Sequence, residues 1–591
     1  MPLLKPNEEH TRKAPFNPRI FGFNGAVTSE HYLAANAGAD VLKAGGNAVD
    51  AAVASALVEG VVNPHQHTIG GECPMIVCMS GDNAPVVVNG NTTAPKAATV
   101  QNYRARGCQE VPDAGILAAG VPAAVGAFAT ALKHFGTMSF AEVSQAALSL
   151  ADEGFPIHRG LLYMPDFGIA ENDAQFRESW PNTAQIYLPD GKVPEPGQRI
   201  QNRALAQCIE AMKQAEMSAS GTREQGIDAV YRAFYDGDIA SEIARHSAKR
   251  NGFLDREDLQ HYQTTLESPV SVEFSDTRVY KCGPWNQGPA LLQSLSILKN
   301  FPLQSYGHNS AEYLHIVVEA VKLAFADREQ WYGDPKQVEV PIVQLLSDHY
   351  GKIRSKLIDL SCVNSEICPG DPLRDLSTLP VEQRLGGKSW GHGTVHVDAV
   401  DRFGNMVSAT PSGGWLKSSE VVKSIGVPLG NRLMTFYLEP ENHPNLAAPG
   451  KQPRTTISPT LVCRQGNPWM VYGSMGGDQQ DQWMLQFLLN RVVFGMTVAQ
   501  SIEAPKFSSH HFPGFFAPHD WTVNHVSIER RVGESVFRRL RSLGHEVETV
   551  PDWTEGFLLA IERDPISGLL EAGYDPRGAK GDVFPATAVC W

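Results

Sequence analysis

The period of the hydrophobic pattern changes about two-thirds of the way along the chain, and this change limits the folds that the sequence can adopt. Residues 310–335 have apolar side chains at helical spacing, and Gly333 and Pro335 predict where that helix stops. Residues 394–410 read TVHVDAVDRFGNMVSAT, an alternating segment, a turn and a second strand, which together predict a β-hairpin. More short strands follow in the stretches TTISPTLVC and PWMVYGS. A helix-rich first part and a strand-rich last third favour stacked layers of helix and sheet built from the whole chain.

The N-terminal region predicts a pair of helices. Ser29 is expected to cap the first helix, which ends at Gly45-Gly46, where the left-handed backbone of a helix stop costs little. Asn47 is expected to cap the second helix, with Asp50 three residues further on. The Ala- and Val-rich body of this second helix predicts burial on all sides.

The composition limits the classes of partner. The 591 residues are 42% hydrophobic and 19% charged, with a formal net charge of −14 and no block of Lys and Arg. This balance argues against nucleic acid and against an anionic membrane surface as partners. The apolar run at 114–132 is long enough for a membrane span, but its glycines and Pro122 favour a buried segment of a large core.

The N-terminus and the cysteines indicate a cytoplasmic protein. Residues 1–20 contain no apolar segment of a secretory signal. The nine cysteines are scattered and odd in number, so we expect reduced thiols rather than a disulfide framework.

A threonine stands at the boundary between the two patterns. Residues 365–393 have no periodicity and predict an exposed, mobile loop, and Thr394 follows it directly. A threonine hydroxyl is a poor nucleophile until a base lies beside it, and an N-terminal threonine has one in its own α-amine, whose pKa is about 7.7–8.0. Cleavage after Gly393 would create that amine, and glycine tolerates the strained backbone of such a cut. By itself a Gly-Thr pair more often marks only the start of a strand.

Longer motifs change the interpretation. The chain contains AGADVLKAGGNAVDAAVASALVEGVVNPHQHTIGG, CGPWNQGPALLQSLSIL, EAVKLAFADREQWYGDP, PRTTISPTLV, YGSMGG and AGYDPRG, in this order. With TVHVDAVDRFGN set against the pattern T-T-H-[FY]-S-x-x-D-x-x-G-N, it resembles the γ-glutamyltransferase family of N-terminal-nucleophile hydrolases over nearly its whole length. The resemblance implies an α/β (α+β) fold, a four-layer αββα sandwich. It also implies a large part, 1–393, and a small part, 394–591, with Thr394 as the nucleophile released by self-cleavage.

Further roles follow from the same resemblance. Ser412 stands where the family has a second threonine, eighteen residues after the nucleophile, whose hydroxyl orients the nucleophile's amine. Gly476 and Gly477 match the family's oxyanion hole, where backbone N–H groups would hold the negative oxygen of a tetrahedral intermediate.

The substrate end of the pocket departs from the family pattern. Asn91 replaces the arginine that binds the substrate carboxylate, Thr435 replaces the aspartate that binds its ammonium, and Arg432 replaces a glutamine. Thr455 and Thr456 replace two serines and keep their hydroxyl groups, whereas Gly414 replaces an asparagine. Charge-assisted hydrogen bonds contribute about 1.5–3 kcal/mol each, so recognition of a γ-glutamyl group is expected to be weakened or replaced. Arg432 is either a new carboxylate anchor or a solvated charge.

Histidine clusters do not predict a metal. His65 and His67 form an H-x-H pair without a carboxylate at ligand spacing, and His510 and His511 are similarly unsupported. His392 and His396 flank Thr394, and His396 is expected to pack or to orient. We therefore expect neither metal nor cofactor.

The sequence favours a self-processing threonine amidohydrolase or acyltransferase that acts on a small amide other than a standard γ-glutamyl compound, oxamate-like or acylase-like. The first alternative is a glutathione hydrolase or transpeptidase with rearranged anchors. The second is a non-catalytic relative kept for binding. The expected partners are a small-molecule amide and the large and small chains of one precursor, with a homo-oligomer left open.

Overall fold

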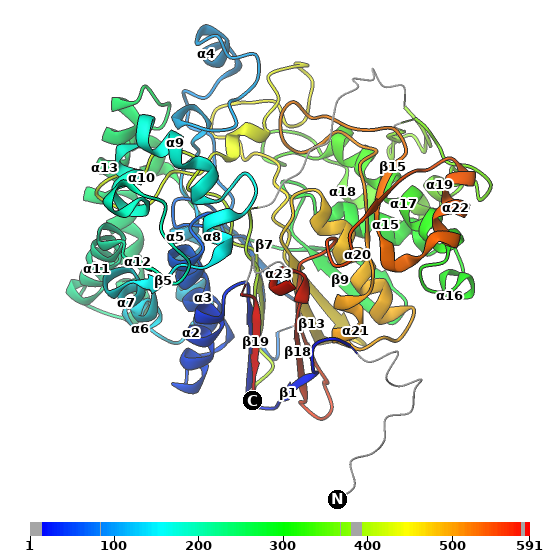
Figure 1. Ribbon diagram of the computed structural model, residues 1–591, viewed down its shortest axis with the longest axis horizontal. Helices are drawn as coiled ribbons and strands as arrows, with labels where there is room; N and C mark the ends of the chain where they lie inside the picture. Colours follow the sequence, from blue (N-terminus) through cyan, green and yellow to red (C-terminus); the bar gives the residue numbers. More distant parts are fainter. Residues whose placement is uncertain (1–14, 83, 367, 380–392, 581–584) are drawn as a thin grey trace, which may run out of the picture.

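The computed structural model describes residues 15–82, 84–366, 368–379, 393–580 and 585–591. Two seven-stranded sheets lie face to face in the middle of the molecule, and helices cover the outer face of each sheet (Figure 1). This arrangement confirms the expected four-layer αββα sandwich.

The first sheet joins strands from before and after residue 393. Its spatial order is β19 (Thr587–Cys590), β2 (Gly25–Ser29), β10 (Val397–Asp401), β11 (Met406–Ala409), β3 (Met75–Cys78), β4 (Val86–Asn89) and β7 (Thr265–Glu267). All neighbouring pairs are antiparallel. Strands β10 and β11 are the hairpin expected from the sequence, and they lie between β2 and β3 of the first part of the chain.

The second sheet is built in the same mixed way. Its spatial order is β1 (Ile20–Gly22), β18 (Leu570–Tyr574), β17 (Leu558–Arg563), β13 (Asn467–Ser474), β12 (Thr460–Arg464), β9 (Thr277–Lys281) and β8 (Val270–Phe274). Strands β12 and β13 confirm the two strands expected after the hairpin. Apolar side chains of both sheets, among them Val400, Met406, Leu461 and Val471, form the core between them.

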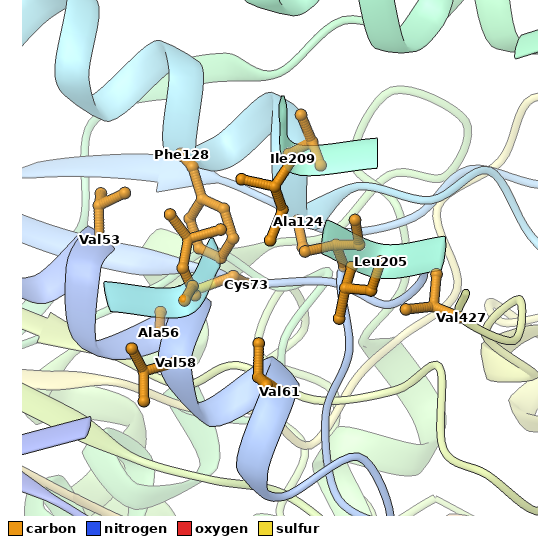
Figure 2. Packing of buried hydrophobic residues seen from close by; sticks show 14 of the residues in the cluster. Val53, Ala56, Val58, Val61, Cys73, Ala124, Phe128, Leu205, Ile209 and Val427 are labelled. Carbon is orange, nitrogen blue, oxygen red and sulfur yellow. The ribbon is translucent and has the colours of Figure 1, made fainter. Parts of the chain in front are cut away.

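One helical layer packs on the first sheet. Its main helices are α2 (Tyr32–Lys43), α3 (Ala48–Val62), α5 (Ala124–Phe135), α6 (Phe140–Val143), α7 (Gln145–Glu153), α11 (Arg203–Ser218), α12 (Arg223–Tyr235) and α13 (Asp238–Lys249). Every residue of α3 is buried, as its composition predicted. Figure 2 shows Val53, Ala56, Val58 and Val61 on α3 within the core that this layer forms with the sheet.

A second helical layer packs on the other sheet. Its main helices are α15 (Pro289–Leu298), α17 (Ala311–Trp331), α19 (Asp348–Ser355), α20 (Gln479–Val492), α21 (Val498–Glu503) and α22 (Glu534–Leu543). Helix α17 begins after its cap Ser310 and ends before Gly333, which confirms the helix expected there.

Shorter elements surround these layers. The remaining helices are α4 (Val100–Ala105), α8 (Arg159–Tyr163), α9 (Ile169–Ser179), α10 (Pro181–Tyr187), α14 (Arg256–His261), α16 (Leu303–Tyr306), α18 (Ile342–Leu345) and α23 (Pro576–Lys580). Two small sheets pair β14 (Phe507–Ser509), β15 (His525–Glu529) and β16 (Glu546–Val550), and β5 (Phe155–Pro156) with β6 (Arg199–Ile200).

The first helical pair corrects one prediction. Asn47 and Asp50 form the expected capping box at the start of α3. The expected cap of α2 is wrong, because Ser29 is the last residue of β2 and His31 caps the helix. The Ser29 hydroxyl donates instead to the carboxylate of Glu59 on α3.

Part of the expected loop is buried. Residues 368–372 are buried, whereas an exposed segment was predicted. The N–H of Gly370 donates to Asp327 at 2.7 Å, and the indole of Trp331 donates to the Gly370 carbonyl at 2.9 Å, so α17 holds this stretch. Residues 380–392 lie outside the described residues.

The apolar run at 114–132 is divided between two short elements. It forms η1 (Ile116–Ala118) and most of α5, and α5 packs into the core of the first helical layer. Within the described ranges, no helix combines the length and the apolarity that crossing a membrane requires.

We expect the stability of the fold to depend on the proton of Glu59. Burial raises the pKa of this carboxyl to about 7, although Ser29, Asn63 and the His31 N–H donate to it. The folded state therefore binds the proton more tightly than the unfolded chain, and the free energy of unfolding falls as the pH rises from about 4.5 and levels off above about 7. Relative to Glu59→Gln, the wild type should lose on the order of 3 kcal/mol across this window. Urea unfolding of both proteins at several pH values measures the difference, and a difference that does not change with pH would contradict it.

Candidate active site

The register of the β10–β11 hairpin fixes which residue faces Thr394. Val397 pairs with Ala409 in the hairpin, and an isolated antiparallel bridge pairs Thr394 with Ser412 in the same register beyond the strand ends. The N–H of Val395 donates to the carbonyl of Pro411 at 3.0 Å between them. The regular strand begins at Val397, so Thr394 precedes it rather than starting it.

The Ser412 hydroxyl is the centre of the site. Its Oγ lies 3.1 Å from Oγ1 of Thr394, which is 4% exposed. It donates to the carbonyl oxygen of Gly393 at 3.0 Å, on the residue before Thr394. Nη2 of Arg432 donates to the same Oγ at 2.9 Å. The structure thus brings together the two predicted cleavage residues, the second hydroxyl and Arg432, which the sequence analysis had placed among the candidate substrate-binding residues.

Arg432 is paired with an acid that the sequence did not single out. Its Nε donates to the carboxylate of Glu72, and both side chains are buried. Burial raises the pKa of the Glu72 carboxyl, against the opposing pull of the guanidinium. The guanidinium also lies over the rings of Trp415 and Phe515, 5.5 Å and 5.9 Å from their centroids. Arg432 is therefore a buried structural charge and not a solvated one.

Gly393, the predicted cleavage residue, has a backbone that other residues rarely adopt. Gly393 has φ +130°, in the region that glycine alone enters easily. A Cβ at this position would lie 2.3 Å from the ring of Phe167, so the space is closed as well. Phe167 packs with Trp415 and Met475 in a small hydrophobic cluster beside the site.

A second cation, Lys417, lies against the same aromatic ring that borders Gly393. Nζ of Lys417 is 3.8 Å from the centroid of the Phe167 ring. Burial lowers the pKa of the Lys417 ammonium, against the raising effect of Asp166 and other acids. The site therefore has two cations on the side of the aromatic cluster.

His396 lies between the two sheets and orients polar groups there. Its Nδ1 is 3.1 Å from the Thr410 hydroxyl and its Nε2 is 2.8 Å from Asp398. Burial raises the pKa of Asp398, and the neighbouring His396 opposes that shift. The expectation of a packing and orienting role fits this environment, and the expected neighbour His392 lies outside the described residues.

The Gly476–Gly477 turn joins β13 to helix α20. With its amide oriented to satisfy its neighbours, Gln480 accepts from the Gly477 N–H at 3.3 Å and donates to the Thr456 carbonyl at 3.1 Å. Gln287 donates to the Gly477 carbonyl at 3.1 Å. Two predicted elements, the glycine turn and the threonine pair, are thus connected through Gln480.

The other predicted substrate residues meet on the segment before β12. The Asn91 amide donates to the carbonyl of Pro453 at 2.8 Å, and its Oδ1 is buried without a partner among the described residues. The Thr435 hydroxyl contacts the carbonyls of Arg432 and Arg454 at 2.9 Å and 3.3 Å. The hydroxyl of Thr455 accepts from the N–H of Ile457, at 3.4 Å. Both positions at which the family resemblance implied a charge, Asn91 and Thr435, are therefore uncharged and buried against backbone carbonyls.

The sequence analysis missed several residues of this site, among them Glu72, Phe167, Trp415 and Gln480. Glu72 directly follows the motif NPHQHTIGG, and Gln480 follows the glycine turn, so only their place next to a motif could have drawn attention to them. Glu72 and Arg432 are 360 residues apart in sequence, and no local pattern connects them.

One group of described residues has the chemistry of metal ligands. Ligand atoms of His315, Glu319 and His545 lie within 4.8 Å of one another. Lys322 already donates to Glu319 at 2.7 Å, and Nδ1 of His315 lies 2.8 Å from Nε2 of His545. Hydrogen bonds and an ion pair therefore account for the group without an ion. None of its members contacts Thr394.

A cavity of about 420 Å³ lies elsewhere, between ends of the two sheets. Its walls include Cys78, Asp82, Arg278 and Cys463, and none of the predicted site residues is among them. We therefore place the candidate active site at Thr394 and not in this cavity.

Known proteins are similar to this chain over most of its length. A family model described as gamma-glutamyltranspeptidase matches residues 34–584. The glutathione hydrolase-like YwrD proenzyme of Bacillus subtilis (strain 168) is 30% identical over 568 residues, which are 95% of this chain and 98% of that protein. The oxamate amidohydrolase proenzyme of Klebsiella pneumoniae (strain ATCC 700721 / MGH 78578) is 29% identical over 566 residues, 94% of this chain and 97% of that protein.

Solved structures of similar proteins have the same fold as this chain. The structure of LmbA2991HD superposes with a TM-score of 0.90 at 37% identity, and covers 98% of this chain and 100% of that one. Cephalosporin acylase from Bacillus halodurans gives a TM-score of 0.83 at 28% identity, with 98% of each chain covered.

We expect the cleavage between residues 393 and 394 to require glycine. In Gly393→Ala, the new Cβ meets Phe167 and the backbone must leave φ +130°, so the carbonyl moves away from Ser412. Loss of one positioned donor typically lowers an acyl-transfer rate about 10²- to 10³-fold. A denaturing gel that follows the full-length chain over time measures the effect. Gly450→Ala is a matched control, because that glycine also has positive φ but open space around it, and cleavage of Gly393→Ala at the wild-type rate would contradict the prediction.

Proposed function

This chain belongs to the gamma-glutamyltranspeptidase family, and from that premise we propose that it is a self-cleaving threonine amidohydrolase for a small amide other than a standard γ-glutamyl compound. As a member of that family it is a hydrolase of amide C–N bonds, and its relatives are named as proenzymes. The observation that supports the proposal most directly is the 3.1 Å contact between the hydroxyls of Thr394 and Ser412, next to the Gly393 carbonyl.

In the proposed mechanism the free α-amine of Thr394 is the general base. It takes the proton of the Oγ1 hydroxyl as that oxygen attacks the carbonyl carbon of the amide, and it passes the proton to the leaving nitrogen. Ser412 positions the nucleophile through its hydroxyl. Water, or an amine acceptor, then releases the acyl group from Thr394.

Gly476 and Gly477 would hold the oxyanion. Because Gln480 accepts from the Gly477 N–H over a long 3.3 Å contact, this N–H can exchange that acceptor for the more negative oxygen of a tetrahedral intermediate. Gln287 and Gln480 would keep the turn in place while the acceptor changes.

The proposed substrate follows from the anchors that are missing. Asn91 and Thr435 offer no charge, and the Thr435 hydroxyl is already used by two backbone carbonyls. A γ-glutamyl group would therefore leave its α-carboxylate and ammonium unpaired, at a cost of about 1.5–3 kcal/mol for each. The buried Oδ1 of Asn91 suits an N–H donor, as an amide offers, and Thr455 and Thr456 retain hydroxyls for a polar acyl group. Relatives named for oxamate and for cephalosporin support a small or acylase-type amide.

One other function remains as an alternative, and the non-catalytic one is disfavoured. A glutathione hydrolase with rearranged anchors is favoured by the name of the YwrD relative. A non-catalytic binding protein would have no need for the set of Thr394, Ser412, Gly476 and Gly477, which this chain keeps.

The first test is the new N-terminus. We expect wild-type protein to separate into two chains on a denaturing gel, with the smaller chain reading Thr-Val-His-Val by N-terminal sequencing. Thr394→Ala should remain full-length because it has no nucleophile. Thr394→Ser, which keeps the hydroxyl, should still cleave. The proposal would be contradicted if the wild-type protein stays intact, or if the Thr394→Ala variant is cut at the same bond.

The second test concerns the substrate. The processed protein should hydrolyse small amides such as oxamate, or amides with an acylase-type acyl group, faster than γ-glutamyl p-nitroanilide. We expect the ratio of kcat/KM to be at least about a hundredfold, because the pocket lacks the two charged anchors for a γ-glutamyl group. Thr394→Ala is the blank for every substrate. A preference for the γ-glutamyl anilide would instead support the glutathione hydrolase.

A further inference from the structure

The three contacts of the Ser412 hydroxyl determine where its only proton lies. A serine hydroxyl donates one hydrogen bond and accepts two. The Gly393 carbonyl can only accept, and it lies 3.0 Å from Oγ. The Arg432 guanidinium can only donate, and it lies 2.9 Å away. The Ser412 proton therefore points to Gly393, and one lone pair of Oγ is used by Arg432.

This assignment leaves one position for Thr394. The second lone pair of Ser412 Oγ faces Oγ1 of Thr394 at 3.1 Å, so the threonine hydroxyl is the donor of that contact. Thr394, Ser412 and the Gly393 carbonyl then form a directed chain of hydrogen bonds. Its direction is from the atom that must lose a proton to the atom that must gain one during cleavage.

The direction depends on Arg432 because an arginine side chain stays charged and never accepts. Glu72 holds the guanidinium through Nε, and the faces of Trp415 and Phe515 border it. A neutral or accepting side chain at 432 would allow the Ser412 hydroxyl to turn toward it and away from Gly393. The Glu72 carboxylate offsets the positive charge, so the pair is electrically balanced inside the protein.

We propose that Arg432, held by Glu72, is a positioning residue for self-cleavage, which directs the Ser412 proton onto the Gly393 carbonyl. This inference rests on the proposed function, since it assigns a role within the cleavage of the same bond. Arg432 acts through Ser412 and does not itself contact the reacting carbon.

The chemical step balances. Oγ1 of Thr394 bonds to the carbonyl carbon of Gly393 while its proton passes to Ser412, and the Ser412 proton passes to the carbonyl oxygen. The resulting tetrahedral centre then loses its C–N bond, and the hydroxyl proton returns through Ser412 to the departing nitrogen. The products are an ester between Gly393 and Thr394 and a free α-amine on Thr394. One water molecule hydrolyses the ester and leaves a Gly393 carboxylate.

The experiment follows cleavage from the moment of synthesis, in cell-free translation with denaturing gels and intact mass. Arg432→Met should cleave about 10- to 100-fold more slowly than wild type, the loss of one charge-assisted hydrogen bond. Glu72→Gln should also be slower, because the guanidinium is less firmly held. Arg432→Lys keeps a permanent donor and should retain more of the rate than Arg432→Met. Arg491→Met is the matched control, since it removes another mostly buried arginine, which is paired with Glu562, and should cleave like wild type.

A chemical rescue separates positioning from general packing. Arg432→Ala leaves room for a small planar ion, so added guanidinium, well below denaturing concentrations, should restore cleavage. Urea has the same shape without the charge and should not restore it. Ser412→Ala lacks the relay hydroxyl and should not respond to guanidinium, whereas Ser412→Thr should cleave without it.

The outcomes distinguish the two proposals. Wild type that never cleaves would overturn the proposed function itself. Wild type that cleaves while Arg432→Met and Arg432→Ala keep its rate would overturn only the role of Arg432. Rescue by urea as good as rescue by guanidinium, or equal slowing in Arg491→Met, would also overturn it, because filled volume or lost stability would then explain the effect.

Discussion

The register of one hairpin determines most of this site. Strands β10 and β11 pair Val397 with Ala409, and the same register continues past their ends to Thr410 opposite His396 and Ser412 opposite Thr394. A shift of one residue would turn every side chain to the other face of the sheet. The spacing of eighteen residues between the two hydroxyls is thus a geometric result of the hairpin and its turn. Both strands are themselves paired on their outer sides, with β2 and β3, so the register is held from two directions.

The charged groups beside Ser412 are paired with each other. Asn91 and Thr435, where the family resemblance implied charged anchors, carry no charge, whereas the guanidinium of Arg432 and the carboxylate of Glu72 form a buried ion pair. Burying an ion pair brings little stability by itself, because desolvation offsets the attraction, but removing one partner leaves a costly unpaired charge. Such a pair is better understood through what it orients. Here it reaches the Ser412 hydroxyl, and through it the two residues of the expected cleavage site.

Local patterns in the sequence predicted the parts of the fold that local physics decides. The capping box at Asn47, the buried helix α3, helix α17 and the β10–β11 hairpin all follow from spacing and turn chemistry over a few residues. The errors arose where contacts distant in sequence decide the structure. Ser29 belongs to strand β2 and donates to Glu59, and residues 368–372 are buried where Asp327 and Trp331 bind Gly370.

The sequence predicted the residues of the candidate site that lie in motifs, but not the side chains that hold those residues in place. Thr394, Ser412 and the glycine turn were identified because they lie in recognisable sequence motifs. The partnership of Arg432 with Glu72 depends on contacts across 360 residues of sequence, and it changes the interpretation of Arg432 from a substrate anchor to a residue that is already paired. Single-residue departures from a family pattern therefore have to be interpreted with their three-dimensional neighbours.

Both sheets combine strands from before and after residue 393, and this has a consequence for what a cut molecule can do. Strand β2 lies between β19 and β10, while β1 and β9 border the block of β18, β17, β13 and β12. If the chain were cut before Thr394, the two fragments would stay associated in one folded molecule. Neither fragment contains all the strands of a sheet or all the residues of a core. Before the cut, unfolding and refolding concern a single chain and do not depend on concentration. After the cut, refolding would require two separate polypeptides to associate, so it would depend on their concentration. Cleavage would therefore create a reactive amine and at the same time make unfolding harder to reverse.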